Sequence, residues 1–319
     1  MVMTGGMAVR SLVLGMAVLG ATLLAAAAEH RVAAVHAHAR ALESSSLSSD
    51  DTRVRVVSIL PHNSTAFTEG LFFHNGKLLE STGLSGSSFV REYNLPSMGR
   101  SINVVAREDV ENPILQEFRF PSGTFGEGIA TVGDKLYALT YKAKKIYVLS
   151  RKNLELLESH PFVTSTGEGW GMTTDNKSLI VSDGSAKIQF YDPVANFTLI
   201  RTIEVRDGNR AISNVNELEF VDGEILANVW FKNEVLRIDP KDGRVIETID
   251  FSWLPDMVTN LKNMKSMRHE AVMNGIAFNP ANRHVYLTGK LWDSLFEIEF
   301  SCYKTAAASS DVDASRGNS

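Results

Sequence analysis

The sequence has one cysteine and no excess of positive charge, and each lack excludes a class of protein. Cys302 is the only cysteine among 319 residues, so no intrachain disulfide can form, and we expect this thiol to be a partly buried spectator. Lys and Arg total 32 against 37 Asp and Glu, a net charge of −5, which gives no support for nucleic-acid binding. The histidines lack the spacing of a metal site, so no metal ligands are predicted.

Long hydrophobic runs are also missing, apart from one near the N-terminus. Arg10 is the only charge before Glu29, and the apolar run from Ser11 to Ala28 ends in alanines. Residues 1–28 are therefore predicted to be a secretory signal peptide or, if uncleaved, a signal anchor. Three glycosylation sequons favour the same lumenal or extracellular compartment: Asn63-Ser64-Thr65, Asn176-Lys177-Ser178 and Asn196-Phe197-Thr198.

A short pattern that begins with Phe125-Gly126-Glu127-Gly128 comes back four more times along the chain. Aligned on the residue before the glycine, its copies lie 58, 43, 47 and 57 residues apart. The repeated position holds, in order, Glu69, Glu127, Trp170, Glu217 and Asn274. A recurrence of this length is typical of stacked or radial repeats.

Each copy is followed by a turn signal made of Asn, Asp or Gly, such as Asn75-Gly76 and Asp222-Gly223, and by two more β-rich runs. Fourth strand candidates follow four copies at 113–120, 154–160, 198–205 and 245–251, while residues 53–60 stand unpaired at the start. Four-stranded antiparallel units around an axis make a propeller. We therefore predict an all-β, five-bladed β-propeller over residues 52–303, closed by residues 53–60 as the outer strand of the last blade. Residues 29–51 are predicted to be a flexible linker and 304–319 a disordered tail.

In a propeller the innermost strands run beside the central channel, so the repeated position should converge there. It supplies carboxylates, an indole and an amide, whereas a purely structural ring would place small or apolar groups at its centre. The structural alternative is that the flanking glycines only allow tight packing and that Glu217 and Glu219 form salt bridges between blades. Spacing alone leaves both interpretations open.

Several longer motifs carry a resemblance to a known family. They are Pro61-His62-Asn63, Ala66-Phe67-Thr68-Glu69-Gly70-Leu71, Glu80-Ser81-Thr82-Gly83-Leu84, Phe125-Gly126-Glu127-Gly128, Gly169-Trp170-Gly171, Asn216-Glu217-Leu218-Glu219, Ala227-Asn228-Val229-Trp230, Asn274-Gly275-Ile276-Ala277 and Leu287-Thr288-Gly289-Lys290-Leu291-Trp292. Together they resemble the plant and bacterial type of glutaminyl-peptide cyclotransferase, or glutaminyl cyclase. The resemblance implies a five-bladed propeller that converts N-terminal glutamine of peptides to pyroglutamate and releases ammonia.

The resemblance also implies roles for single residues. Glu127 matches the family's proton-shuttling glutamate, and Lys290 and Asn216 match positions that could donate to the oxygen of a tetrahedral intermediate. The implied substrate-binding residues are Phe67, Glu69, Tyr141, Trp170, Trp230 and Asn274. Two positions depart from the family, which commonly has Gln in place of Glu69 and often Trp in place of Tyr141.

Two other functions stay open on the sequence. One is a calcium-dependent hydrolase of the lactonase type, and the other is a non-catalytic propeller that binds protein partners. For the leading hypothesis we expect a monomer that acts on peptides or proteins with N-terminal Gln, with no nucleic-acid partner and membrane attachment only if the signal segment is retained. No cofactor is expected for catalysis, and a structural cation in the channel is left open.

A last expectation concerns residues 253–270. Their apolar residues recur at helical spacing, which predicts a helix that caps one mouth of the ring.

Overall fold

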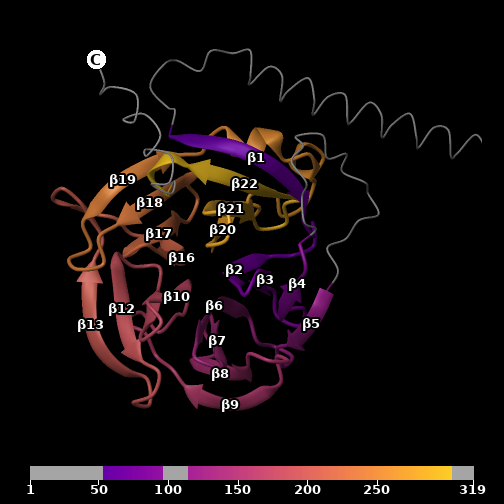
Figure 1. Ribbon diagram of the computed structural model, residues 1–319. Helices are drawn as coiled ribbons and strands as arrows, with labels where there is room; N and C mark the ends of the chain where they lie inside the picture. The colour runs from indigo at the N-terminus through magenta and orange to yellow at the C-terminus, as the bar shows by residue number, and fades with distance from the viewer. Residues whose placement is uncertain (1–52, 96–113, 304–319) are drawn as a thin grey trace, which may run out of the picture. The chain divides into compact units, whose positions relative to one another are not determined.

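The computed structural model describes residues 53–95 and 114–303, and these residues form five four-stranded antiparallel sheets. The predicted signal segment, linker and tail lie outside the described residues. Figure 1 shows the sheets arranged around a centre as the blades of a propeller, each with its first strand innermost. The five-bladed all-β architecture predicted from the repeats is confirmed.

Four blades are built from consecutive strands. Blade 1 is β2 (Thr68–His74), β3 (Lys77–Thr82), β4 (Phe89–Tyr93) and β5 (Ile114–Arg119). Blade 2 is β6 (Gly126–Val132), β7 (Lys135–Thr140), β8 (Lys145–Ser150) and β9 (Leu156–Pro161). Blade 3 is β10 (Met172–Thr174), β11 (Leu179–Ser182), β12 (Lys187–Asp192) and β13 (Thr198–Glu204). Blade 4 is β16 (Val215–Val221), β17 (Glu224–Val229), β18 (Glu234–Ile238) and β19 (Val245–Asp250). A small hairpin of β14 (Arg206–Asp207) and β15 (Arg210–Ala211) precedes blade 4.

The fifth blade joins the two ends of the described chain. Its strands are β20 (Met273–Asn279), β21 (His284–Gly289), β22 (Ser294–Phe300) and, outermost, β1 (Val54–Pro61). β1 pairs antiparallel with β22 from Val54 opposite Phe300 to Pro61 opposite Ser294. In Figure 1 the indigo β1 lies beside the yellow β22. The predicted closure of the ring by residues 53–60 is confirmed.

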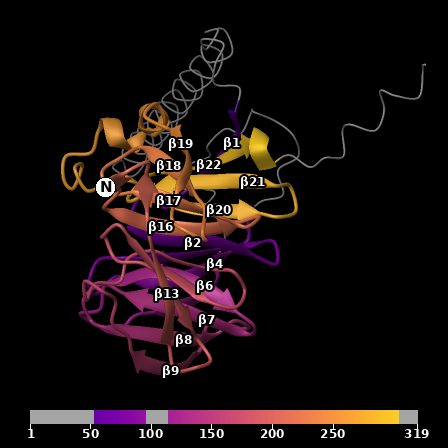
Figure 2. The ribbon, with the colours of Figure 1, turned by 90° about the vertical axis from the view of Figure 1, so that its left-hand side faces the viewer.

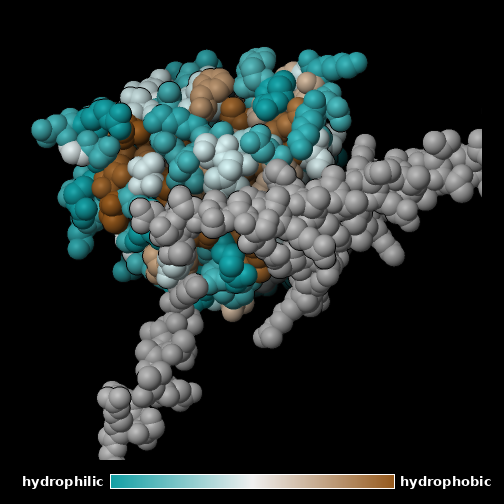
Figure 3. Space-filling model, turned by 90° about the horizontal axis from the view of Figure 1, so that it is seen from above, coloured by the Kyte–Doolittle hydropathy of each residue, from teal (hydrophilic) through white to brown (hydrophobic). Residues whose placement is uncertain are grey.

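The hydrophobic core is divided among the contacts between neighbouring blades. Each cluster joins side chains of two adjacent sheets: Leu79 and Ile129, Ile146 and Leu179, Ile188 and Ile225, Val235 and Val285, and Leu78 and Leu295. Successive side chains of a strand point to opposite faces, so the consecutive buried residues of strands such as β7 and β17 fill the space on both faces of a blade. In the side view of Figure 2, β20, β16, β2 and β6 lie one below another near the middle of the body. On the side shown in Figure 3, hydrophilic and hydrophobic residues are interspersed over the visible described surface.

Residues 253–270 do not form the predicted helix. They contain two short 3₁₀ turns, η1 (Leu254–Met257) and η2 (Asn260–Lys262), and a third, η3 (Ser301–Tyr303), follows β22. The side chain of Asn260 donates to Leu291 O at 2.7 Å, and its backbone N–H donates to Asp293 Oδ2 at 3.0 Å. These contacts bind the segment to the turn after β21, while buried Leu254 and Leu261 supply the apolar periodicity. Tertiary contacts thus outweigh the helical pattern.

Two smaller observations complete the fold. Cys302 lies in η3 and is exposed, so its predicted partial burial is wrong. Within the described residues, none of the helices has the length and apolar character needed to cross a membrane.

Candidate active site

In four of the five blades the repeated position falls on a break in the strand pairing, whereas in blade 3 Trp170 precedes the first paired residue of β10, Met172. The ladder shifts register at Glu69 in blade 1, Glu127-Gly128 in blade 2, Asn216-Glu217 in blade 4 and Asn274-Gly275 in blade 5. Such a bulge takes a residue out of the regular ladder and redirects its side chain. The sequence repeat therefore becomes a repeated local distortion of the innermost strands.

The glycines beside this position let the innermost strands approach one another. A Cβ at Gly128 would lie 2.2 Å from Met172 N, and one at Gly171 would lie 2.1 Å from Asn216 O. Any side chain there would push the strands apart, so the structural interpretation holds for these two glycines.

The predicted site residues gather at one end of the blades. The bulges lie near the start of the innermost strands, and Tyr141, Trp230 and Lys290 each follow the end of a second strand, β7, β17 and β21. Because the first two strands of a blade are antiparallel, those two places meet at the same mouth of the channel.

At this mouth two carboxyl groups and one ammonium group form a buried charged centre. Lys290 Nζ donates to Glu69 Oε1 at 2.7 Å, and a side-chain hydrogen bond joins Glu69 to Glu127. Glu69 is 1%, Glu127 5% and Lys290 6% exposed. Two acids thus face a single cation away from water.

This arrangement favours the protonated form of the acids. Burial, and then the charge of Glu69, raise the pKa of Glu127 well above its ordinary value. Burial also raises the pKa of Glu69, although the Lys290 ammonium offsets part of that rise. Two carboxyl groups in contact cannot both ionise easily, so the pair retains one proton to higher pH than a free glutamate does.

Asparagine side chains border the charged centre. Asn274 Nδ2 donates to Thr68 O at 2.9 Å and to Glu69 Oε2 at 3.3 Å. The Oδ1 atoms of Asn274 and Asn216 are buried and have no hydrogen-bond partner among the described residues. Buried polar atoms without a partner are uncommon, so both carboxamides are suited to contacts with a bound polar ligand.

One aromatic group lies directly beside the charged centre. Lys290 Nζ is 4.6 Å from the centre of the Phe67 ring, a cation–π contact. The Phe125 ring stands between Phe67 and Tyr141, with ring centres 6.0 and 5.7 Å away. Phe125 was not predicted as a site residue, although it precedes the Gly-Glu-Gly motif.

A second aromatic group is formed by Trp170 and Trp230, which pack edge to face with ring centres 5.4 Å apart. Trp170 Nε1 donates to Glu168 Oε2 at 3.1 Å, and Glu168 also forms an ion pair with Lys142. Lys142 in turn lies 4.6 Å from the centre of the Tyr141 ring. Glu168, which the sequence analysis missed, therefore connects the two aromatic groups.

Glu217 and Glu219 do not form the predicted salt bridges. Glu217 accepts from the backbone N–H groups of Leu71 and Ile276, and Glu219 accepts from that of Phe278. Both carboxyl groups therefore join blades through the backbone. Burial raises the pKa of Glu219 to about 8 and that of Glu217 well above its ordinary value.

Within residues 53–95 and 114–303, no group of three or more His, Cys, Asp or Glu is arranged to hold a metal ion. The chemistry visible at this mouth is that of a carboxyl pair, an ammonium group, carboxamides and aromatic rings.

A family model, a relative in sequence and a solved structure all relate this chain to glutaminyl cyclases. The sequence model of a family described as glutamine cyclotransferase matches residues 23–300. The chain is 33% identical over 260 residues to the glutaminyl-peptide cyclotransferase of Arabidopsis thaliana, covering 81% of this chain and 73% of that protein. The crystal structure of Myxococcus xanthus glutaminyl cyclase is similar with a TM-score of 0.65 and 32% identity, covering 77% of this chain and 95% of the other.

Proposed function

Because this chain belongs to the glutamine cyclotransferase family, we propose that it cyclises N-terminal glutamine of peptides and proteins to pyroglutamate with Glu127 as the proton shuttle. The chain is accordingly an acyltransferase. The observation that carries the assignment of roles is the buried contact of Glu69, Glu127 and Lys290 at one mouth of the channel.

The reaction needs one proton to be moved between two nitrogens. The α-amine attacks the carbon of its own γ-carboxamide, a C–N bond forms, and the C–N bond to the amide nitrogen then breaks. The Glu127 carboxylate accepts the proton of the amine and returns it to the departing NH₂, which leaves as ammonia. Both reacting groups belong to one residue, so the remaining task of the protein is to hold a reactive rotamer.

Lys290 and Asn216 are proposed to stabilise the oxygen of the tetrahedral intermediate. Lys290 has three N–H donors, of which one is directed to Glu69 at 2.7 Å, so others are available for a substrate oxygen. The buried carboxamide of Asn216 supplies a neutral donor. Donors that are already oriented in a dry site stabilise developing charge without reorganisation.

The remaining site residues are proposed to bind the substrate. Glu69 and Asn274 offer oxygens to the α-amine, while Phe67, Tyr141, Trp170 and Trp230 enclose the apolar part of the glutaminyl side chain. Tyr141 and the two tryptophans are only partly buried, which suits residues at the mouth where a peptide enters.

The setting of the enzyme is also a proposal. We infer a secreted or lumenal monomer, attached to a membrane only if residues 1–28 are retained, that needs no cofactor for catalysis. The asparagines of all three sequons are exposed, which supports glycosylation in that compartment. Mass spectrometry of the secreted protein before and after glycosidase treatment tests the secretion and the glycosylation.

Incubation with a peptide that begins with Gln tests the reaction. We expect a mass loss of one ammonia and a blocked N-terminus, and no change in a matched peptide that begins with Asn. An unchanged Gln peptide, with the protein folded, would overturn the proposed activity.

A further inference from the structure

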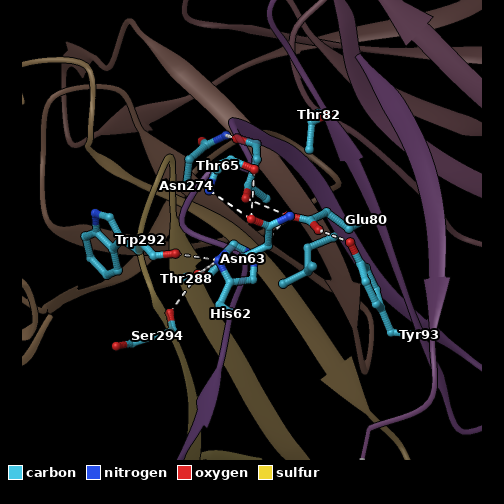
Figure 4. Close-up of polar contacts among 12 residues, drawn as sticks. His62, Asn63, Thr65, Glu80, Thr82, Tyr93, Asn274, Thr288, Trp292 and Ser294 are labelled. Atoms are coloured by element: carbon cyan, nitrogen blue, oxygen red, sulfur yellow. Dashed lines mark hydrogen bonds and ion pairs between the residues drawn. The ribbon is translucent and has the colours of Figure 1, made fainter. Parts of the chain in front are cut away.

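His62 and Glu80 form a buried ion pair that contacts residues close in the sequence to Lys290 and Glu69. His62 Nε2 lies 2.9 Å from Glu80 Oε1, and His62 Nδ1 lies 2.8 Å from the backbone oxygen of Trp292. The His62 side chain is 6% and that of Glu80 1% exposed. Figure 4 shows the imidazole between Trp292 on one side and Glu80 on the other.

The partners of His62 fix its protonation. A backbone carbonyl can only accept a hydrogen bond, and Glu80 already accepts from Thr68 Oγ1 at 2.7 Å and from the Tyr93 hydroxyl at 3.0 Å. His62 Nδ1 must therefore donate to the Trp292 carbonyl. Burial alone would raise the pKa of Glu80, but the charge of His62 and the hydrogen bonds outweigh it and lower that pKa, so Glu80 is a carboxylate that accepts from Nε2 and His62 is an imidazolium. Burial alone would lower the pKa of His62, but the charge of Glu80 and both hydrogen bonds outweigh it and raise the pKa.

The ion pair contacts both the segment that carries Lys290 and the segment that carries Glu69. Trp292, whose carbonyl accepts a hydrogen bond from His62, follows Lys290 by two residues in the turn after β21. Thr68, whose hydroxyl is bound by Glu80, immediately precedes Glu69 at the bulge of β2. His62 and Glu80 thus connect the neighbours of the two groups that meet at 2.7 Å.

The turn that carries Lys290 needs such a connection. Leu291 has a φ of 61°, a left-handed conformation that costs free energy for a branched residue. Its N–H donates to Ala66 O at 2.7 Å, and the next residue, Trp292, is the one bound by His62. The surrounding contacts, rather than the local preference of the chain, hold this turn in shape.

We propose that the His62–Glu80 ion pair positions Lys290 against Glu69, so that His62 and Glu80 are positioning residues of the active site. The proposal rests on the proposed function for its effect on turnover. One imidazolium fixes the backbone of the Lys290 turn, and its carboxylate partner fixes the residue before Glu69. Without the His62–Glu80 ion pair, Lys290 can move away from the Glu69–Glu127 carboxyl pair and from the substrate oxygen.

The test compares His62→Gln with His284→Gln. His284 forms the same kind of pair with Glu297, at 2.7 Å, at the far end of β21 from Lys290, and is the matched control. We expect His62→Gln to lower kcat roughly 10- to 100-fold with KM nearly unchanged, because a misplacement of about 1 Å costs up to about 10²-fold. His284→Gln should keep the wild-type kcat. A folded His62→Gln variant with wild-type kcat would overturn the proposal while leaving the cyclase assignment intact.

Two further measurements keep the proposal testable if His62→Gln is unstable or if the wild type proves inactive on Gln peptides. Thr68→Val removes only the hydroxyl that Glu80 binds, and Thr68→Ser keeps it, so kcat should fall about tenfold in the first and be retained in the second. Equal kcat values would refute the connection to Glu69. A crystal structure of Thr68→Val or His62→Gln gives a readout that needs no turnover: we expect Lys290 Nζ to be displaced from Glu69, and an unchanged contact would contradict the proposal.

Discussion

Replacing Glu69 by Gln should lower the pH at which the enzyme becomes active. Glu127 must lose its proton before it can accept one from the substrate, and the charge of Glu69 is, after burial, the largest cause of its raised pKa. The variant removes that charge, keeps the shape of the side chain, and leaves Lys290 without its carboxylate partner at 2.7 Å. Both changes stabilise the Glu127 carboxylate.

The size of the effect follows from the contact between the two carboxyl groups. Two unit charges about 4 Å apart interact by about 4 kcal/mol at an effective dielectric constant of about 20. That energy corresponds to about 3 pKa units, and the shared proton and Lys290 already cancel part of it. We therefore expect the rising limb of kcat against pH, which reports the bound complex, to move down by at least about 1 unit.

The assay is kcat for a Gln peptide at closely spaced pH values. Glu168→Gln is the matched control, since Glu168 contributes least among the causes that raise the pKa of Glu127 and should give a much smaller shift in the same direction. A limb that stays in place or moves upward in Glu69→Gln would refute the coupling of the two carboxyl groups.

Three other predictions concern the fold and the cofactor. A chain that starts at Ser64 lacks β1 and exposes the edge of β22, so it should aggregate and melt at lower temperature than one that starts at Asp51; equal solubility and melting would exclude a closing role for β1. The pKa of Glu219 is raised to about 8 in the folded protein, so at neutral pH the folded protein keeps a proton on this carboxyl group that the unfolded chain has lost. The stability that this difference contributes at low pH is lost as pH rises toward 8. Glu219→Gln should therefore flatten the fall in unfolding free energy between about pH 4.3 and pH 8, measured by denaturant titration, whereas an equally steep fall would contradict this origin. Dialysis against a chelator should leave turnover unchanged, and a loss restored by Ca²⁺ would favour a metal-dependent mechanism.

The architecture was predictable because one pattern recurs in every blade. Short β-rich runs separated by turn signals define the strands, and the unpaired run before the first copy indicated how β1 closes the ring. The same recurrence identified Glu69, Glu127 and Asn274 as neighbours at the axis. What it could not show is the bulge at each of these positions, since a register shift depends on the partner strand.

Contacts between distant segments account for what the sequence did not reveal. The helical spacing after Trp253 marks a buried face, but bonds from Asn260 to the turn after β21 replace the helix. Glu219 accepts a hydrogen bond from the backbone N–H of Phe278 in the next blade. Every residue except proline has such a donor, so the type of residue does not predict this partner. His62 and Glu80 stand in the quoted motifs, yet only the folded chain brings them to 2.9 Å.

Glu127→Gln tests the central claim most directly, because it keeps the shape and neutral form of the buried carboxyl group and removes its ability to carry a proton. We expect kcat to fall about 10²- to 10⁴-fold, the range for one general acid–base group. Circular dichroism and melting temperature should match the wild type, since no charge is left uncompensated. Turnover close to that of the wild type in this folded variant would contradict the role of Glu127 as the proton shuttle.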